Sequence, residues 1–274
     1  MSKNLTLVAD VGGTNTRFAL ADHNGVIEGS SQRYSNTGID SFLDAAHLYI
    51  STLTGEMPTV LCAAIAGPVS NGQGKLTNGD WVFDTAELAK ELDLKSAHLL
   101  NDLVALGYAL DVLPDHAVTK IGGGDPKGCQ SLVAGIATGF NISLCHAGHV
   151  VEAELGHSSM PSKVTNVLQD ALGDKAAEFV TVENLFSGDG LAALHVALGF
   201  DAMSPAQITA EEGPTVALFA KALGIYCSQL NYLYMPLAGL YLNGSVARAI
   251  VEHDDAAKVV ATEGSQDAAF AGRF

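Results

Sequence analysis

Short apolar runs separated by glycine turns begin this chain. "LTLVAD" and "TRFALAD" each predict a β-strand, and the glycine turn between them predicts a hairpin. A third strand is expected in "HNGVIEGSSQRYS", where Asn24-Gly25 supplies a tight turn. The three segments together predict an antiparallel meander at the start of the chain.

Helical and strand-like segments alternate over the next eighty residues. The apolar spacing of residues 39–53 predicts a helix, and "TVLCAAIAGPV" predicts a buried strand. "TNGDWVFDTAELAKELDL" combines a short strand with a helix capped by Asp84 or Thr85. "SAHLLNDLVALGYAL" is expected to change from strand to helix at Asn101-Asp102.

The meander pattern then occurs a second time. "CQSLVAGIATGFNISLCHAGHVVEAELGH" alternates three strands with two turns, and a helix follows in "SKVTNVLQDALG". "VALFAKALGIYCSQLNYLY" predicts an apolar helix, and "GLYLNGSV" predicts a strand and a turn. The repeat predicts two related α/β lobes with a cleft between them, and a chance likeness of two meanders is the alternative. We place a smaller lobe at residues 1–103 and a larger lobe at 104–274.

Composition and charge narrow the class of protein. The chain has 274 residues, of which 48% are hydrophobic and 16% charged, as in globular proteins. Its net charge of −16 repels phosphate backbones, which argues against a nucleic-acid partner. The four cysteines are scattered, and no apolar run has the length of a signal peptide core or a membrane span. We therefore expect a cytoplasmic protein with no membrane partner.

The first glycine turn, "DVGGTN", has two interpretations. Gly12, Gly13, Thr14 and Asn15 can aim backbone N–H groups and side-chain donors at a phosphate, and Asp10 can hold a hydrated Mg²⁺. The alternative is an ordinary hairpin turn that the aspartate stabilises. The turn has neither the P-loop spacing nor the dinucleotide-binding spacing, so neither of those mechanisms applies.

Polar residues at other strand ends are further candidates. Thr138 and Gly139, with Ala137, form the equivalent turn of the second meander and are expected to make the opposite wall of a phosphate site. Asn101 and Asp102 end a strand, where ligands bind in α/β sheets, although both residue types are also common helix caps.

Acidic residues and a histidine follow in the second half. Glu152 and Glu154 are expected to share one face of a strand, and His157 lies three residues beyond Glu154. No second pair of metal ligands is evident, so these groups suit sugar hydroxyls better than a metal. Glu183 is expected on a helix before the turn "SGDG", where a solvated charge is the simpler interpretation.

The order of these motifs resembles that of the bacterial glucokinases, which are sugar kinases of the actin-like superfamily. The matching segments are "ADVGGTNTRFAL", "AIAGPV", "TNGDWVF", "LLNDLVAL", "AGIATGFN", "AELGHSSMP" and "ENLFSGDGL". They occur in family order across roughly residues 5–195. The resemblance implies an α/β fold of two actin-like (ribonuclease H-like) lobes with a central cleft, and a homodimer is compatible with it.

The resemblance also implies an activity and roles for individual residues. The activity is ATP-dependent transfer of phosphate to the 6-hydroxyl of glucose or a similar sugar, with ATP and Mg²⁺ as cofactors. Asp102 matches the catalytic base. The positions that match the sugar site are Asn78, Asn101, Asp102, Glu154, His157 and Glu183. The positions that match the nucleotide site are Asp10, Gly12, Gly13, Thr14, Asn15, Thr138, Gly139, Gly244 and Ser245, with Asp10 also holding Mg²⁺ through water.

The chain departs from the family pattern mainly near the nucleotide. The substituted glycine or small positions are Ala137, Asn141, Ala153, Leu155, Asn243 and Ser245. Asn141 is expected to tolerate the left-handed backbone that glycine adopts. The chain is also expected to lack the usual C-terminal return helix of the second lobe. Two alternatives therefore stand beside the glucose kinase: a sugar-binding relative with little or no activity, and a kinase for a different sugar.

Overall fold

The structure, a computed structural model, describes residues 5–265. It divides the chain into two compact units, Met1–Ala105 and Leu106–Phe274. The expected absence of a C-terminal return helix concerns the chain from residue 266 onward, which lies outside the described residues. No helix within residues 5–265 is both long and apolar enough to cross a membrane.

The first unit is a mixed sheet with helices and a small second sheet. Its strands are β1 (Thr6–Val11), β2 (Asn15–Asp22), β3 (Gly25–Val26), β4 (Gln32–Ser35), β5 (Val60–Ile65), β6 (Val69–Ser70), β7 (Gln73–Lys75), β8 (Val82–Asp84) and β9 (Ser96–Asn101). Its helices are α1 (Phe42–Ser51), α2 (Thr85–Glu91) and the start of α3 (Asp102–Ala109).

The main sheet of this unit has the order β3-β2-β1-β5-β9, with β4 paired to β2. Strand β1 is antiparallel to β2 and parallel to β5, and β5 is parallel to β9. The predicted strands and helices of this half are confirmed, except that the single third strand expected after Asn24-Gly25 is two short strands, β3 and β4, which both pair with β2. The short strand predicted ahead of α2 is β8. Strands β6 and β7, which pair with it in a three-stranded sheet, were missed because they are only two and three residues long, too short to show a period of two.

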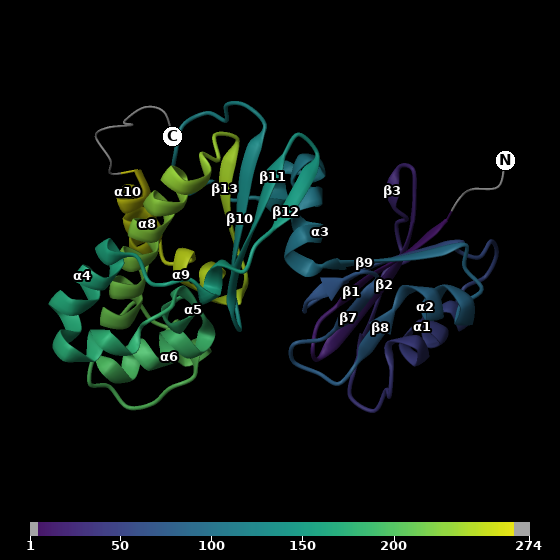
Figure 1. Cartoon of the computed structure of the whole chain (residues 1–274), viewed down its shortest axis with the longest axis horizontal. Helices are drawn as coiled ribbons and strands as arrows, with labels where there is room; N and C mark the ends of the chain where they lie inside the picture. Colours follow the sequence, from purple (N-terminus) through teal and green to yellow (C-terminus); the bar gives the residue numbers. More distant parts are fainter. Residues whose placement is uncertain (1–4, 266–274) are drawn as a thin grey trace. The chain divides into compact units, whose positions relative to one another are not determined.

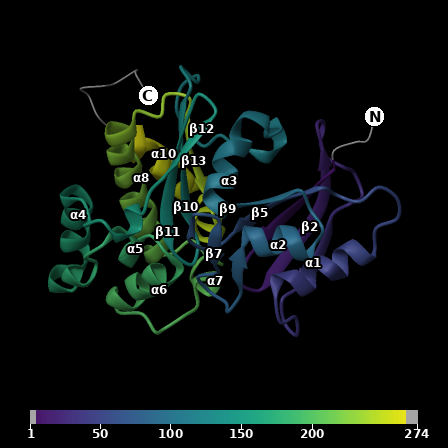
Figure 2. The same ribbon diagram turned by 45° about the vertical axis from the view of Figure 1, so that its right-hand side comes forward.

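Helices α1 and α2 lie on the same face of the main sheet (Figures 1 and 2). Phe42 and Tyr49 of α1 are fully buried against Phe18 of β2, and ring centroids lie 5.5 and 5.4 Å apart. Asp84 caps α2 by accepting hydrogen bonds from two backbone N–H groups, which confirms one of the two predicted caps. The aromatic packing holds the glycine turn that joins β1 to β2 on a rigid support.

The second unit has one sheet and more helices. Its strands are β10 (Gln130–Ile136), β11 (Phe140–His146), β12 (His149–Glu152) and β13 (Gly239–Asn243). Its α-helices after α3 are α4 (Ser162–Leu172), α5 (Val182–Leu185), α6 (Gly188–Ala197), α7 (Pro205–Ile208), α8 (Pro214–Tyr234), α9 (Ser245–Val251) and α10 (Asp254–Ser265). The 3₁₀ turns are η1 (Leu110–Val112), η2 (Asp115–Ala117), η3 (Leu155–His157) and η4 (Gly173–Glu178).

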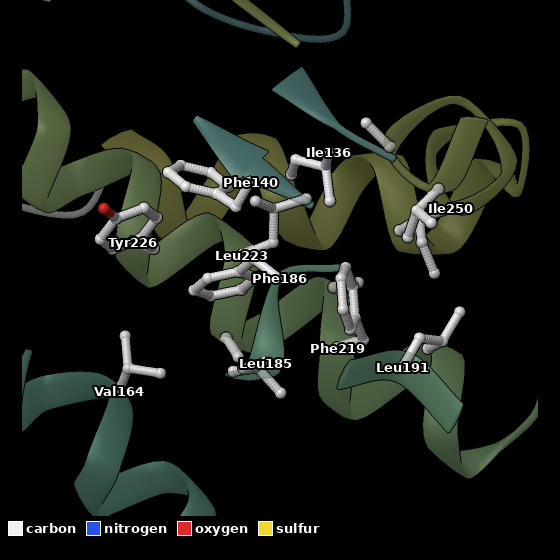
Figure 3. Packing of buried hydrophobic residues seen from close by; sticks show 14 of the residues in the cluster. Ile136, Phe140, Val164, Leu185, Phe186, Leu191, Phe219, Leu223, Tyr226 and Ile250 are labelled. Atoms are coloured by element: carbon white, nitrogen blue, oxygen red, sulfur yellow. The ribbon is translucent and has the colours of Figure 1, made fainter. Parts of the chain in front are cut away.

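The sheet of the second unit has the order β12-β11-β10-β13. Strand β10 is antiparallel to β11 and parallel to β13, which repeats the arrangement of β1 with β2 and β5. The long helix α8 packs beside α10, as Figures 1 and 2 both show. Phe140, Phe186, Phe219 and Tyr226 gather between the sheet and these helices (Figure 3). The repeated α/β topology is that of the actin-like fold.

Candidate active site

The first glycine turn is a hairpin with two free amides. The backbone N–H of Gly12 donates to the carbonyl of Asn15 at 2.9 Å, so this amide serves the turn and does not face a ligand. The N–H groups of Gly13 and Thr14 have no backbone partner within residues 5–265. Thr14 is exposed, and its hydroxyl accepts from the Asn15 amide at 2.9 Å, which leaves the hydroxyl proton free to donate. The turn thus offers two amides and a hydroxyl to an anion.

A residue that the sequence did not single out, Asn36, fixes this turn. Its side-chain nitrogen donates to the carbonyl of Gly12 at 2.8 Å, and its backbone N–H donates to the carbonyl of Thr14 at 2.9 Å. Its side-chain oxygen accepts from the buried Thr16 hydroxyl at 2.9 Å. No local signal identifies Asn36, because its partners lie about twenty residues away along the chain.

Gly13 brings the phosphate turn against the loop that carries Asn78. A β-carbon on Gly13 would lie 2.3 Å from the backbone oxygen of Asn78, so no larger residue fits there. Gly12 differs, because a β-carbon there would lie 3.5 Å from its nearest neighbour, an ordinary contact. Neither glycine has a positive φ. Gly13 is therefore required by close approach, and the predicted sugar loop and the first phosphate turn are neighbours in this unit.

Asp10 pairs with an arginine that the sequence did not single out. Its Oδ2 lies 3.0 Å from a guanidinium nitrogen of Arg17, the residue directly opposite on β2. Both side chains are more than half exposed, so the pair is screened by solvent and exchangeable. The Oδ1 atom of Asp10 has no hydrogen bond within the described part of the chain. A carboxylate with one free oxygen suits the outer coordination of a hydrated Mg²⁺.

Asn101 and Asp102 have separate tasks at the end of β9. The Asn101 side-chain oxygen accepts from the N–H groups of Leu103 and Val104, at 3.0 and 3.4 Å, and so caps α3. Its nitrogen donates to the carbonyl of Gly67 at 3.2 Å, which leaves one N–H for a ligand. Of the two candidate caps, Asn101 is the residue that caps the first turn. Its predicted contact with sugar stays a prediction.

The environment of Asp102 strengthens it as a base. Partial loss of water around the carboxyl group raises its pKa, and the negative charge of Asp10 raises it further. A hydrogen bond from the Leu103 N–H at 2.9 Å opposes this shift. The residue as a whole remains exposed, so it is the carboxyl end of the side chain that neighbouring protein atoms crowd. Asp102 thus combines access to a ligand with a raised proton affinity.

The second glycine turn also offers two amides. The Ala137 N–H donates to the Gly139 carbonyl at 3.0 Å, whereas the N–H groups of Thr138 and Gly139 have no backbone partner among residues 5–265. Thr138 is exposed. The Gly188 N–H, at the start of α6, donates to the Ala137 carbonyl at 2.8 Å. The alanine at position 137 thus leaves the N–H groups of Thr138 and Gly139 free to donate.

Gly244 lies against the same turn. Its φ of +101° is one that residues with a side chain rarely adopt, and a β-carbon there would lie 2.2 Å from the Ile136 carbonyl oxygen. Ser245 begins α9 and is exposed. The predicted adenosine segment and the second phosphate turn therefore adjoin each other in the second unit.

Glu154 directly precedes the 3₁₀ turn η3, which contains His157, and neither residue lies in a strand. Strand β12 ends at Glu152, so the expectation that Glu152 and Glu154 share a strand face is wrong. The chain must tighten here, because a β-carbon on Gly156 would lie 2.3 Å from the Phe140 carbonyl oxygen. Glu154 and His157 are both exposed, and the His157 N–H donates to the Glu154 carbonyl at 3.4 Å. The two residues thus begin and end one tight turn of the chain.

Asn141 does not adopt the left-handed backbone expected of it. It lies in β11 opposite Gly135 and its φ is not positive. Its side-chain oxygen accepts from the Leu155 N–H at 3.1 Å and thereby fastens the 3₁₀ turn to the sheet. The asparagine at this position thus helps to hold the backbone between Glu154 and His157, two of the predicted sugar-site residues.

Glu183 lies on the short helix α5, as expected, and is half buried. Its Oε2 accepts from the Phe140 N–H at 2.9 Å. The second unit therefore brings Glu183 to the end of the 137–139 turn.

Comparisons with known proteins identify the family of this chain. The profile of the Glucokinase family matches residues 7–262. A glucokinase of Saccharophagus degradans is 31% identical over 272 residues, covering 90% of this chain and 84% of that protein. A glucokinase of Chromobacterium violaceum is 31% identical over 260 residues, covering 88% and 74%. The crystal structure of a glucokinase from an Antarctic psychrotroph superposes with a TM-score of 0.82 at 26% identity, covering 98% of this chain and 91% of that one. The chain belongs to the glucokinase family.

Proposed function

We propose that this chain is an ATP-dependent hexose kinase that phosphorylates the 6-hydroxyl of glucose or a similar sugar. The observation that carries the proposal is Asp102, whose carboxyl group stands at the end of β9 with a raised pKa. A carboxylate of ordinary pKa is a weak base at neutral pH, and a raised pKa makes it a better proton acceptor. A proton acceptor at this position favours catalysis over sugar binding alone.

The reaction follows from these residues. Asp102 accepts the proton of the sugar 6-hydroxyl as the oxygen attacks the γ-phosphorus of ATP, and ADP leaves with the bond electrons. The free amides of Gly13, Thr14, Thr138 and Gly139 are the donors that would hold phosphate oxygens. Glu154, just before the 3₁₀ turn η3, and His157, at its end, are the groups that would hold sugar hydroxyls. A hydroxyl of the wrong configuration would leave one of them unpaired.

Mg²⁺ is part of the proposal. Asp10, with one oxygen free of hydrogen bonds to described residues, is the group that would hold the ion through water. When bound, Mg²⁺ neutralises phosphate charge during transfer. Arg17 is drawn to the same carboxylate, so addition of the ion would weaken this exposed pair.

The cellular setting and assembly are also proposals. The use of ATP suits the cytoplasm, and a homodimer fits the resemblance to the family. Light scattering across a range of protein concentrations measures the assembly directly. A mass of one chain at all concentrations would refute the dimer and leave the kinase proposal intact.

A coupled assay with glucose and Mg-ATP tests the activity. We expect turnover with wild-type protein and loss of turnover in Asp102→Asn. Calorimetric binding of glucose without any turnover in the wild type would refute the kinase and support a sugar-binding relative. A panel of hexoses in the same assay, followed by ADP release, identifies the sugar.

A further inference from the structure

Glu183 is bound to the second phosphate turn from within its own unit. Its Oε2 accepts the Phe140 N–H at 2.9 Å, and a β-carbon on Gly139 would lie only 2.5 Å from the same oxygen. A hydrogen bond to a carboxylate is stronger than one between neutral groups. The carboxylate therefore sets the position of the backbone at the end of the 137–139 turn.

The rest of the Glu183 segment holds the same turn. The Ser187 hydroxyl donates to the Glu183 carbonyl at 2.8 Å, and the Gly188 N–H donates to the Ala137 carbonyl at 2.8 Å. Phe140 and Phe186 pack together in the core, with ring centroids 6.2 Å apart (Figure 3). The turn is thus fastened at its first residue by an amide of α6, and just after its last residue by a carboxylate of α5.

The other oxygen of Glu183 remains available. Oε1 makes no hydrogen bond to residues 5–265, and the side chain is half buried and so retains access to a ligand. One carboxylate can then accept from a backbone amide through Oε2 and from a sugar hydroxyl through Oε1. Glu154 has no comparable link, because it is exposed and its side chain has no hydrogen bond within the described residues.

We propose that Glu183 is a positioning residue for the nucleotide as well as a sugar ligand. Its Oε2 holds the 137–139 turn in the shape that presents the Thr138 and Gly139 amides, whether or not sugar is bound. The inference rests on the proposed function, since it assumes that these amides bind nucleotide phosphate. Because one side chain contacts both sites, sugar bound at Oε1 would also stiffen the phosphate turn.

Calorimetric binding of Mg-ADP without any sugar tests this role. We expect Glu183→Ala to weaken Mg-ADP binding by about tenfold, since a charge-assisted hydrogen bond to the turn is lost. Glu183→Gln keeps an oxygen that can accept from Phe140, so most of the Mg-ADP affinity should return, whereas glucose binding should stay weakened. Glu154→Ala is the matched control and should weaken glucose binding alone.

Two further measurements distinguish a specific effect of Glu183 on the 137–139 turn from a general loss of structure in the variant. Thr181→Ala removes the side-chain cap of the same helix without touching the turn, and should leave Mg-ADP binding unchanged. Hydrogen exchange at the amide of Phe140 should accelerate in Glu183→Ala and not in Glu154→Ala. An unchanged Mg-ADP affinity in Glu183→Ala would overturn the inference alone. A wild-type protein that binds no Mg-ADP would overturn the proposed function and the inference with it.

Discussion

The negative charge of Asp10, on β1, raises the pKa of Asp102, the first residue of α3. Asp10 lies on β1 and pairs with Arg17, whereas Asp102 follows β9, two strands away in the sheet. The parallel strands β1, β5 and β9 place their carboxyl ends at one edge of the sheet, which brings the proposed metal carboxylate near the proposed base.

Replacement of the proposed base should abolish most of the turnover. Asp102→Asn keeps the size of the side chain and removes its ability to accept a proton. We expect kcat to fall by about a hundredfold or more, with little change in the dissociation constant for glucose. Steady-state kinetics and calorimetry measure the two quantities. An unchanged kcat would show that Asp102 only contributes to the start of α3.

The charge of Asp10 should be visible in the pH dependence of activity. The acid limb of kcat/KM against pH reports ionisation of the base, and Asp10 raises the pKa of that base. Asp10→Asn should therefore move the limb to lower pH. Arg17→Gln breaks the same ion pair but keeps the Asp10 charge, and should not lower the limb. If the acid limb moved to lower pH in both variants, loss of the Asp10–Arg17 ion pair would explain the shift, and the charge of Asp10 would not.

The same raised pKa predicts a gain in stability when the charge is removed. The pKa of Asp102 in the folded state lies above its ordinary value, so folding favours the protonated carboxyl group. The protonated group therefore contributes to the free energy of unfolding at low pH, and this contribution is lost as pH rises through the folded-state pKa. At pH 7 the ionised Asp102 therefore destabilises the fold. Asp102→Asn should raise the melting temperature at pH 7, and the gain should shrink as pH falls toward 4. A lower melting temperature at pH 7 would contradict this sign.

Gly12 and Gly13 of the first turn should differ sharply in how much stability is lost when each is replaced by alanine. A β-carbon at Gly13 would meet a backbone oxygen of the Asn78 loop at 2.3 Å, whereas one at Gly12 would lie 3.5 Å from its neighbour. Gly13→Ala should cost about 2 kcal/mol or more of unfolding free energy, and Gly12→Ala less than about 0.5 kcal/mol. Denaturant titration of both variants measures the difference. An equally small loss of unfolding free energy in both variants would mean that the Asn78 loop moves aside at little cost.

The helix cap and the ligand role of Asn101 can be separated. Its side-chain oxygen accepts from the Leu103 and Val104 amides, so Asn101→Ala should lose about 1 kcal/mol of stability. Asn101→Ser keeps a capping oxygen and should recover most of that loss. If Asn101 also binds sugar through its remaining N–H, the serine variant should still show a raised KM for glucose. Wild-type stability together with a wild-type KM for glucose in Asn101→Ser would mean that Asn101 acts only as a helix cap.

Local pattern was sufficient to predict most of the secondary structure and the repeated topology. Alternating apolar residues define β1, β2, β10 and β11, and the glycine turns between them lie where expected, because each depends only on neighbouring residues. The order of the motifs along the chain was sufficient to identify the family. Short elements such as β6, β7 and α7 were missed because their formation depends on packing and not on a local period.

Tertiary structure decided how the candidate residues are used. It gave Asp10 an arginine partner, tied Asn101 to Gly67 and joined Glu183 to Phe140. It also placed the Asn78 loop against Gly13. The physical reason is range: strand and helix periods arise between residues a few positions apart. The pairs that shape this site range from Asp10 with Arg17, 7 positions apart, to Gly244 with Ile136, 108 positions apart. Sequence alone carries no measure of those distances.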